Sequence, residues 1–258
     1  MIFLIIRRLF WPFLIFSASY SCVDDDYDKT DPSASFADAR EYYEDENYEI
    51  ALQRLGEFKS RFPYSKHAVE AELLIAKSHF ELENFEEAAV EFKQFIKLHP
   101  KNKDVPYAMF MVGKSYWTGS PDDIDRDQDL TKTAIKEWQV LLDKYPNSEY
   151  SSKAKTMMKE GHRRIAESHL FVVQFYCKQE IFHACAHRAM ALLELYPQYK
   201  DIKLTALHKA ALAFSHLAEQ KEEERDSDKN IFFKSLTSQQ LSDKAKQFKS
   251  LADKLEPN

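Results

Sequence analysis

Apolar residues recur along this chain at a fixed interval, which predicts a series of paired helices. Seven positions between residues 39 and 63 carry residues of the same kind 37 positions later. The matched pairs are Ala39 and Ala76, Tyr43 and Phe80, Tyr48 and Phe85, Ala51 and Ala88, Leu55 and Phe92, Phe58 and Phe95, and Pro63 and Pro100. Small residues allow two antiparallel helices to approach closely, aromatic residues fill the seam between them, and a proline ends the second helix. One such pair cannot bury both of its faces, so the pattern predicts an all-α chain in which helix pairs stack as a solenoid.

The repeated pattern extends over about five helix pairs, and its order of small, aromatic and proline positions resembles the tetratricopeptide repeat. We assign residues 34–101 to repeats 1 and 2, residues 102–199 to repeats 3 and 4, and residues 200–258 to repeat 5 and a C-terminal cap. We expect Asn47 and Asn84 in the turns between paired helices. The fifth pair, from Leu204 to about Leu255, contains the polar stretch Arg225 to Asn230 and is less apolar, as a capping repeat should be.

The third repeat contains an insertion. Its first helix begins in register, because Gly113 lies 37 positions after Ala76, but Ala134 lies 46 positions after Ala88. The difference, 46 minus 37, is nine inserted residues, and we place the inserted loop at residues 118–130. Insertions in solenoids form loops on one face, which is often the binding face.

Residues 1–21 have the layout of a secretory signal peptide. Arg7 and Arg8 precede an apolar run from Leu9 to Phe16, which is too short to span a bilayer, and small residues follow. A transmembrane anchor is the alternative, but Pro12 interrupts the run. The small residue before Cys22 resembles a bacterial lipobox, so we expect a covalent lipid on Cys22, followed by a linker over residues 22–33. The Val after this cysteine, in place of the Asp that usually retains lipoproteins in the inner membrane, suggests the outer membrane.

Composition and charge narrow the possible functions. The chain has a formal charge of −6, and removal of residues 1–21, which hold two arginines and no acid, leaves 34 basic and 42 acidic residues, or −8. Without a long basic run, such a chain is repelled by phosphate backbones, so we expect no nucleic-acid partner. The chain contains only four glycines and no phosphate-binding loop or nucleophile motif, so we expect no enzymatic activity.

Two groups of residues raise the question of a metal site or a disulfide. His183 and His187 are four residues apart, a spacing that can hold zinc, and five aspartates between residues 122 and 129 resemble a calcium loop. Neither group has the further residues that such sites need, so we expect no metal and no cofactor other than the lipid. Cys177 and Cys185 could pair in an oxidising compartment, but we favour two buried thiols.

Several short motifs add a resemblance to a known family. They are Phe62-Pro63-Tyr64-Ser65, Tyr107 to Gly113, the inserted Asp125-Arg126-Asp127-Gln128, Tyr145 to Tyr150, and Arg188 followed by Tyr196-Pro197. Together with the repeats, they make the chain similar to the BamD family, the tetratricopeptide lipoproteins of the β-barrel assembly machinery in Gram-negative outer membranes. The likeness extends from Cys22 to about Pro197.

This resemblance implies a non-enzymatic scaffold on the periplasmic face of the outer membrane. Its partners would be a BamA-like barrel-forming protein, other assembly lipoproteins and unfolded outer-membrane protein precursors. The resemblance makes Arg188 and the loop residues Asp125, Arg126, Asp127 and Gln128 candidates for partner contacts. A groove on the first helices of repeats 1 to 3 would hold an extended precursor, with Tyr43, Tyr64, Tyr107 and Met111 as candidate groove residues. The alternative is another periplasmic tetratricopeptide lipoprotein, serving pilus assembly or cell-wall coordination, which the insertion disfavours.

Overall fold

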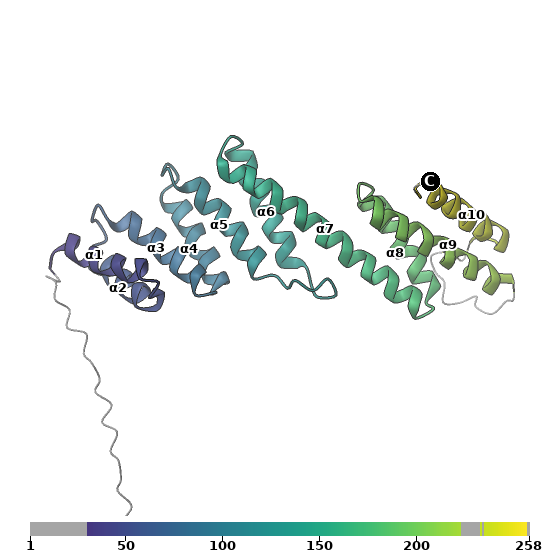
Figure 1. Cartoon of the computed structure of the whole chain (residues 1–258), viewed down its shortest axis with the longest axis horizontal. Coiled ribbons are helices and arrows are strands. Elements are labelled where there is room, and N and C mark those ends of the chain that lie inside the picture. Colours follow the sequence, from purple (N-terminus) through teal and green to yellow (C-terminus); the bar gives the residue numbers. More distant parts are fainter. Residues whose placement is uncertain (1–29, 223–232, 234, 257–258) are drawn as a thin grey trace, which may run out of the picture.

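The computed structural model describes residues 30–222, 233 and 235–256, which form ten helices and no strand. The helices are α1 (Pro32–Glu44), α2 (Tyr48–Arg61), α3 (Ala68–Glu81), α4 (Phe85–Leu98), α5 (Val105–Thr118), α6 (Asp129–Lys144), α7 (Glu149–Lys178), α8 (Phe182–Leu195), α9 (Lys200–Glu222) and α10 (Ser238–Asp253). They follow one another in a single row, so that each helix packs mainly on its neighbours in sequence (Figure 1). This arrangement confirms the prediction of an all-α solenoid of about five helix pairs.

The repeated small and aromatic positions form the core, as their spacing predicts. Ala51 and Ala88 are completely buried, and Phe58 and Phe95, at equivalent positions on α2 and α4, are 1% exposed. Phe92 is also completely buried. Because each of these side chains faces a neighbouring helix and not solvent, the repeat positions are explained by packing alone.

The turns inside the pairs share one backbone conformation. Asn47 and Asn84 directly precede α2 and α4, in the turns where we expected them. The residues before them, Glu46 and Glu83, both have φ of 61°, and Glu180 before α8 has φ of 57°. A left-handed residue reverses the chain sharply at the end of a helix, so these three glutamates mark the same turn in three repeats.

The structure confirms the displaced second helix of the third repeat, because α5 ends at Thr118 and α6 begins only at Asp129. Gly113 on α5 faces Trp138 on α6, and a Cβ atom at Gly113 would collide with the indole ring. The glycine is therefore required by the close approach of these two helices.

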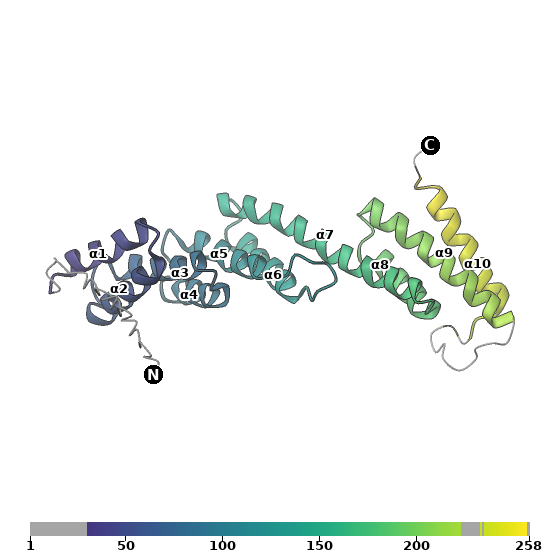
Figure 2. The same ribbon diagram turned by 60° about the horizontal axis from the view of Figure 1, so that its bottom comes forward.

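Helix α7 is 30 residues long and connects two separate cores. The central core extends to Ile165, while the C-terminal core begins at Ala166, the next residue of the same helix. Figure 2 shows α7 running from the α5–α6 pair to α8. A first helix of this length was not predicted, and it makes α7 the connection between the two halves of the solenoid.

Cys177 at the end of α7 and Cys185 on α8 form a disulfide, with their Cα atoms 5.1 Å apart. The expectation of two free thiols is wrong. The turn at Glu180 folds the first turns of α8 back onto the last turn of α7, which brings the two Cα atoms within the range that a disulfide can bridge.

The fifth pair consists of α9 and α10, in the region where the sequence predicts a final helix pair. The polar stretch Arg225 to Asn230, the signal peptide at 1–21 and the lipidation candidate Cys22 lie outside the described residues. In the part that is described, no helix has both the length and the apolar character that crossing a membrane requires.

Candidate partner-binding surfaces

The first surface is aromatic and lies on α1, α3, α5 and the start of α7, where the sequence predicts a groove for an extended precursor; we refer to it as the groove. The ammonium of Lys77 on α3 lies 5.0 Å from the centre of the Tyr107 ring on α5. The Tyr107 ring in turn meets the Tyr150 ring edge-on, with centroids 5.5 Å apart. A cation and two tyrosine rings from three helices thus form one continuous surface that can contact both apolar and polar groups.

Tyr43 on α1 also belongs to this surface, because it affects the pKa of Tyr107. Burial, together with the negative charge of Glu81 and the nearby Tyr48, raises the pKa of Tyr43 to about 12. The pKa of Tyr107 is also raised, first by burial and then by Tyr43, Tyr150, Glu81 and Asp104. Because Tyr43 contributes to the shift of Tyr107, the structure places the predicted groove residues Tyr43 and Tyr107 near each other.

A hollow of about 420 Å³ adjoins the groove between α3 and the turn that leads to α5. Lys77 and Lys103 lie on its rim with Glu70 and Asp104, while Leu73 contributes to its apolar wall. Both charges are present at the rim, so the hollow can accommodate a backbone or a polar side chain of either sign.

Two of the predicted groove residues lie elsewhere. Tyr64 stands in the turn between α2 and α3, where its side chain is 99% exposed. Met111 is 6% exposed and belongs to the central core, so it supports α5 from within and is not available as a groove residue.

The inserted loop is held by a small buried polar network. Gln128, 4% exposed, donates from its amide nitrogen to the carbonyl oxygens of Asp123 and Arg126. Its amide oxygen accepts a hydrogen bond from the Thr131 hydroxyl, which is 2.7 Å from the Ser120 hydroxyl. Gln128 was predicted as a partner contact, but burial places it inside the loop, where it fixes the loop's shape.

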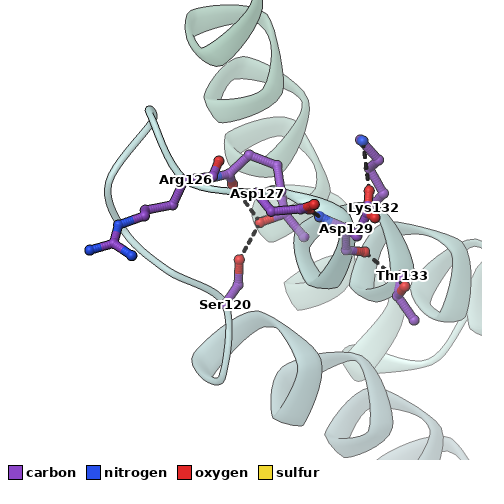
Figure 3. A network of polar contacts seen from close by, with 8 residues as sticks. Ser120, Arg126, Asp127, Asp129, Lys132 and Thr133 are labelled. Carbon is purple, nitrogen blue, oxygen red and sulfur yellow. Dashed lines mark hydrogen bonds and ion pairs between the residues drawn. The ribbon is translucent and has the colours of Figure 1, made fainter.

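The other three candidates of the loop are exposed. Figure 3 shows the Arg126 side chain pointing away from the helices, while Ser120 points inward. Asp125 and Asp127 are also exposed, and a carboxylate oxygen of Asp127 accepts from the backbone nitrogen of Asp129 at 2.6 Å. The arginine that connects the loop to a helix is Arg164 of α7, which pairs with Asp122 at 3.0 Å and lies 4.0 Å from the centre of the Trp117 ring.

The second surface is basic and surrounds Arg188, which is exposed on α8. Burial, followed by the positive charges of Lys132 and Arg188, lowers the pKa of His169 on α7. The His169 ring also packs on Tyr196, with centroids 5.4 Å apart. Lys132, which follows the inserted loop, pairs with Asp129 at 2.8 Å. Lys132 at the end of the loop and Arg188 on α8 therefore have His169 as a common neighbour.

The guanidinium of Arg188 has no hydrogen-bond or ion-pair partner among the residues that the structure describes. An exposed arginine of this kind can form a bidentate pair with a carboxylate of a binding partner.

Sequence reasoning did not find Lys77, Glu81 and Tyr150 in the groove, or Lys132 and His169 beside Arg188. These residues come from helices far apart in the chain, so only the stacking of the helices shows that they meet.

Comparisons with known proteins agree on one family. The YfiO family, described as "Outer membrane lipoprotein", matches residues 28–229. The chain is 34% identical over 92 residues to the outer membrane protein assembly factor BamD of Xylella fastidiosa (strain Temecula1 / ATCC 700964), an alignment that covers 36% of this chain and 31% of that protein. It is 36% identical over 73 residues to the factor of the same name from Vibrio cholerae, covering 28% of this chain and 30% of that one.

These alignments span less than a third of the relatives' own length. One solved structure, "MamA RS-1 ArsTM double mutant", is 14% identical to this chain, with a TM-score of 0.34, and the match covers 87% of this chain and 98% of that one.

Proposed function

The chain belongs to the YfiO family of outer membrane lipoproteins, and on this premise we propose that it is a non-enzymatic scaffold for the assembly of outer-membrane β-barrel proteins. In this role a lipid on Cys22 holds it at the periplasmic face of the outer membrane. It binds a BamA-like barrel-forming protein, other assembly lipoproteins and unfolded precursors. The name of its relatives, outer membrane protein assembly factor, supports this role.

The observation that carries the proposal is the exposed guanidinium of Arg188, which has no ion-pair or hydrogen-bond partner in the described part of the chain and lies near His169. A guanidinium attracts a carboxylate, and an arginine with no ion pair among the described residues loses none of these pairs when it binds one. We therefore assign Arg188 to the contact with the barrel-forming protein. The exposed loop residues Asp125, Arg126 and Asp127 form the adjacent part of this contact.

The groove at Tyr43, Lys77, Tyr107 and Tyr150 is suited to unfolded precursors. Aromatic rings bury apolar side chains without demanding one particular sequence, and tyrosine hydroxyls and Lys77 can bind backbone carbonyls. A site of this composition accepts many extended segments, which is what a scaffold that serves many precursors requires.

The contact is tested by measuring the affinity of the full chain for the periplasmic region of the barrel-forming protein by surface plasmon resonance. We expect Arg188→Ala to weaken binding by about 2 kcal/mol or more, since one charged partner of an interface pair is removed. Its stability should change by only about 0.5 kcal/mol, because the side chain is exposed. Arg40→Ala, which removes an exposed arginine of α1, is the matched control and should bind like the parent.

Phe92→Ala is a control that distinguishes a loss of folding from a loss of the contact with the barrel-forming protein. This substitution empties a fully buried site and should cost about 3 to 5 kcal/mol of stability. If Arg188→Ala binds as tightly as the parent, Arg188 is not part of the contact. Affinity purification from detergent-solubilised outer membrane tests the role as a whole, because recovery of a pilus secretin or a peptidoglycan enzyme in place of a barrel-assembly protein would contradict it.

A further inference from the structure

A second hollow, of about 600 Å³, lies where the end of α6, the first half of α7 and the turn between α8 and α9 meet. Its size is within the range of pockets that bind peptides and small ligands. Met158, 9% exposed, and Tyr196 contribute to its apolar wall, and Leu195 at its edge is 57% exposed. The hollow therefore offers apolar contact area that α7 and α8 do not cover.

Positive side chains line one side of this hollow. Lys155, Lys159 and His162 are exposed and lie at intervals of four and three residues, on one face of α7. No aspartate or glutamate is among the residues that line it. Among the described residues, none of these three side chains makes an ion pair or a hydrogen bond. Three other cations of α7 are paired, namely Lys153 with Glu149, Arg163 with Glu167 and Arg164 with Asp122.

The charge of this hollow differs from that of the first one. The hollow beside α3 occupies the equivalent place in its repeat, but Glu70 and Asp104 accompany its lysines. Two like charges next to each other on a helix face destabilise the helix, and a nearby acidic side chain would offset this repulsion. The second hollow has no such neighbour in a chain whose formal charge is −6, so its positive charge is available to a ligand.

We propose that this hollow binds an acidic, extended segment of a partner protein, with one bulky apolar side chain of that segment against Leu195, Met158 and Tyr196. The carboxylates of the segment pair with Lys155 and Lys159, and the His162 ring can donate a hydrogen bond to one of them. The apolar wall favours a peptide over a lipid bilayer. Attraction to a bilayer surface needs a cluster of about four to eight basic residues, and the negative net charge of the chain opposes it.

The proposal goes beyond the assembly role and does not depend on it, since it concerns a different surface from the groove and from Arg188. Tyr196 is common to both surfaces. Its ring packs on His169 near Arg188, and it also lines the hollow.

The test uses the full chain and fluorescein-labelled synthetic peptides, with binding measured by fluorescence anisotropy. The probe is a short peptide rich in aspartate and glutamate with a central phenylalanine. One comparison peptide carries lysine in place of the acids, and another carries alanine in place of the phenylalanine. We expect the probe to bind, the lysine peptide not to bind, and the alanine peptide to bind at least about tenfold more weakly.

Lys155→Glu combined with Lys159→Glu should weaken binding of the probe by about a hundredfold, because attraction becomes repulsion. The matched control, Lys178→Glu combined with Lys254→Glu, changes the net charge equally at exposed sites away from the hollow and should leave the affinity within about twofold of the parent. Leu195→Ala should weaken the phenylalanine probe but not the alanine peptide.

Three results would overturn the proposal. The first is absence of binding by the probe, and the second is an equal loss of affinity in both double variants, which would indicate unspecific attraction. The third is binding of the chain to vesicles of phosphatidylglycerol that is lost in the Lys155 and Lys159 variant while the probe peptide does not bind. That result would assign the hollow to lipid headgroups.

Discussion

The indole nitrogen of Trp138 lies 3.0 Å from the carbonyl oxygen of Phe110 and donates a hydrogen bond to it across the contact between α5 and α6. Trp138 is completely buried, so this bond satisfies a polar group that would otherwise be lost from water. The bond forms only because Gly113, one turn further along α5, leaves space for the ring. The close contact between α5 and α6 therefore depends on the hydrogen bond that Trp138 donates and on the absence of a side chain at Gly113.

We expect Gly113→Ala to lower the free energy of unfolding by about 1 to 3 kcal/mol, because the added methyl group overpacks the site and displaces the Trp138 ring. Urea unfolding followed by tryptophan fluorescence measures the loss directly. Gly56→Ala on α2 is the matched control, since a Cβ atom there has no neighbour within 4 Å. It should raise stability by about 0.5 to 1 kcal/mol, because alanine favours the helix. Equal effects of the two substitutions would contradict the role of Gly113.

Much of the fold could be predicted from the sequence because packing repeats at a fixed interval. Ala51, Ala88, Phe58 and Phe95 are core residues for a local reason, the spacing of apolar positions along each helix, and local patterns can be read from one chain. The insertion was also predicted, because the register of Ala134 relative to Ala88 records it.

The features that were missed depend on contacts between helices or on chain reversal. The disulfide between Cys177 and Cys185 forms because the turn at Glu180 reverses the chain, whereas eight residues of continuous helix would place the two sulfurs about 12 Å apart. Gln128 was predicted as a partner contact from the family resemblance. Its burial follows from the hydrogen bonds that it makes within the loop, which no periodicity indicates.

The left-handed turn before α4 predicts a substitution that raises the free energy of unfolding, whereas most substitutions lower it. Glu83 has φ of 61°, a conformation that costs a residue with a side chain about 1 to 2 kcal/mol. Glu83→Gly should therefore raise the free energy of unfolding by about 0.5 to 1 kcal/mol, after allowance for the greater freedom of glycine in the unfolded chain. Glu87→Gly, an exposed site inside α4, should lower it by about as much. Thermal unfolding of the two variants side by side checks both signs.

Removal of the disulfide should destabilise the C-terminal half of the solenoid. The closed loop between Cys177 and Cys185 is short, and its loss should cost about 2 to 3 kcal/mol through the greater entropy of the unfolded chain. We expect dithiothreitol to lower the unfolding temperature of the parent but not that of the Cys177→Ser, Cys185→Ser double variant. If dithiothreitol leaves the parent unchanged, the two cysteines are not paired in solution.

The phenol of Tyr43 predicts a loss of stability at alkaline pH. Burial and Glu81 raise its pKa to about 12, above the value of about 10 in an unfolded chain. Between these values the unfolded chain releases the proton while the folded chain keeps it, so stability declines as the pH rises from about 10 to about 12. Tyr43→Phe should therefore show a smaller decline than the parent when urea midpoints at about pH 9 and about pH 11 are compared. Tyr64→Phe is the control, because its ring is 99% exposed and meets water in both states. If Tyr43→Phe declines as steeply as Tyr64→Phe, the Tyr43 phenol is not buried against Glu81 in solution, and this part of the groove is open to water.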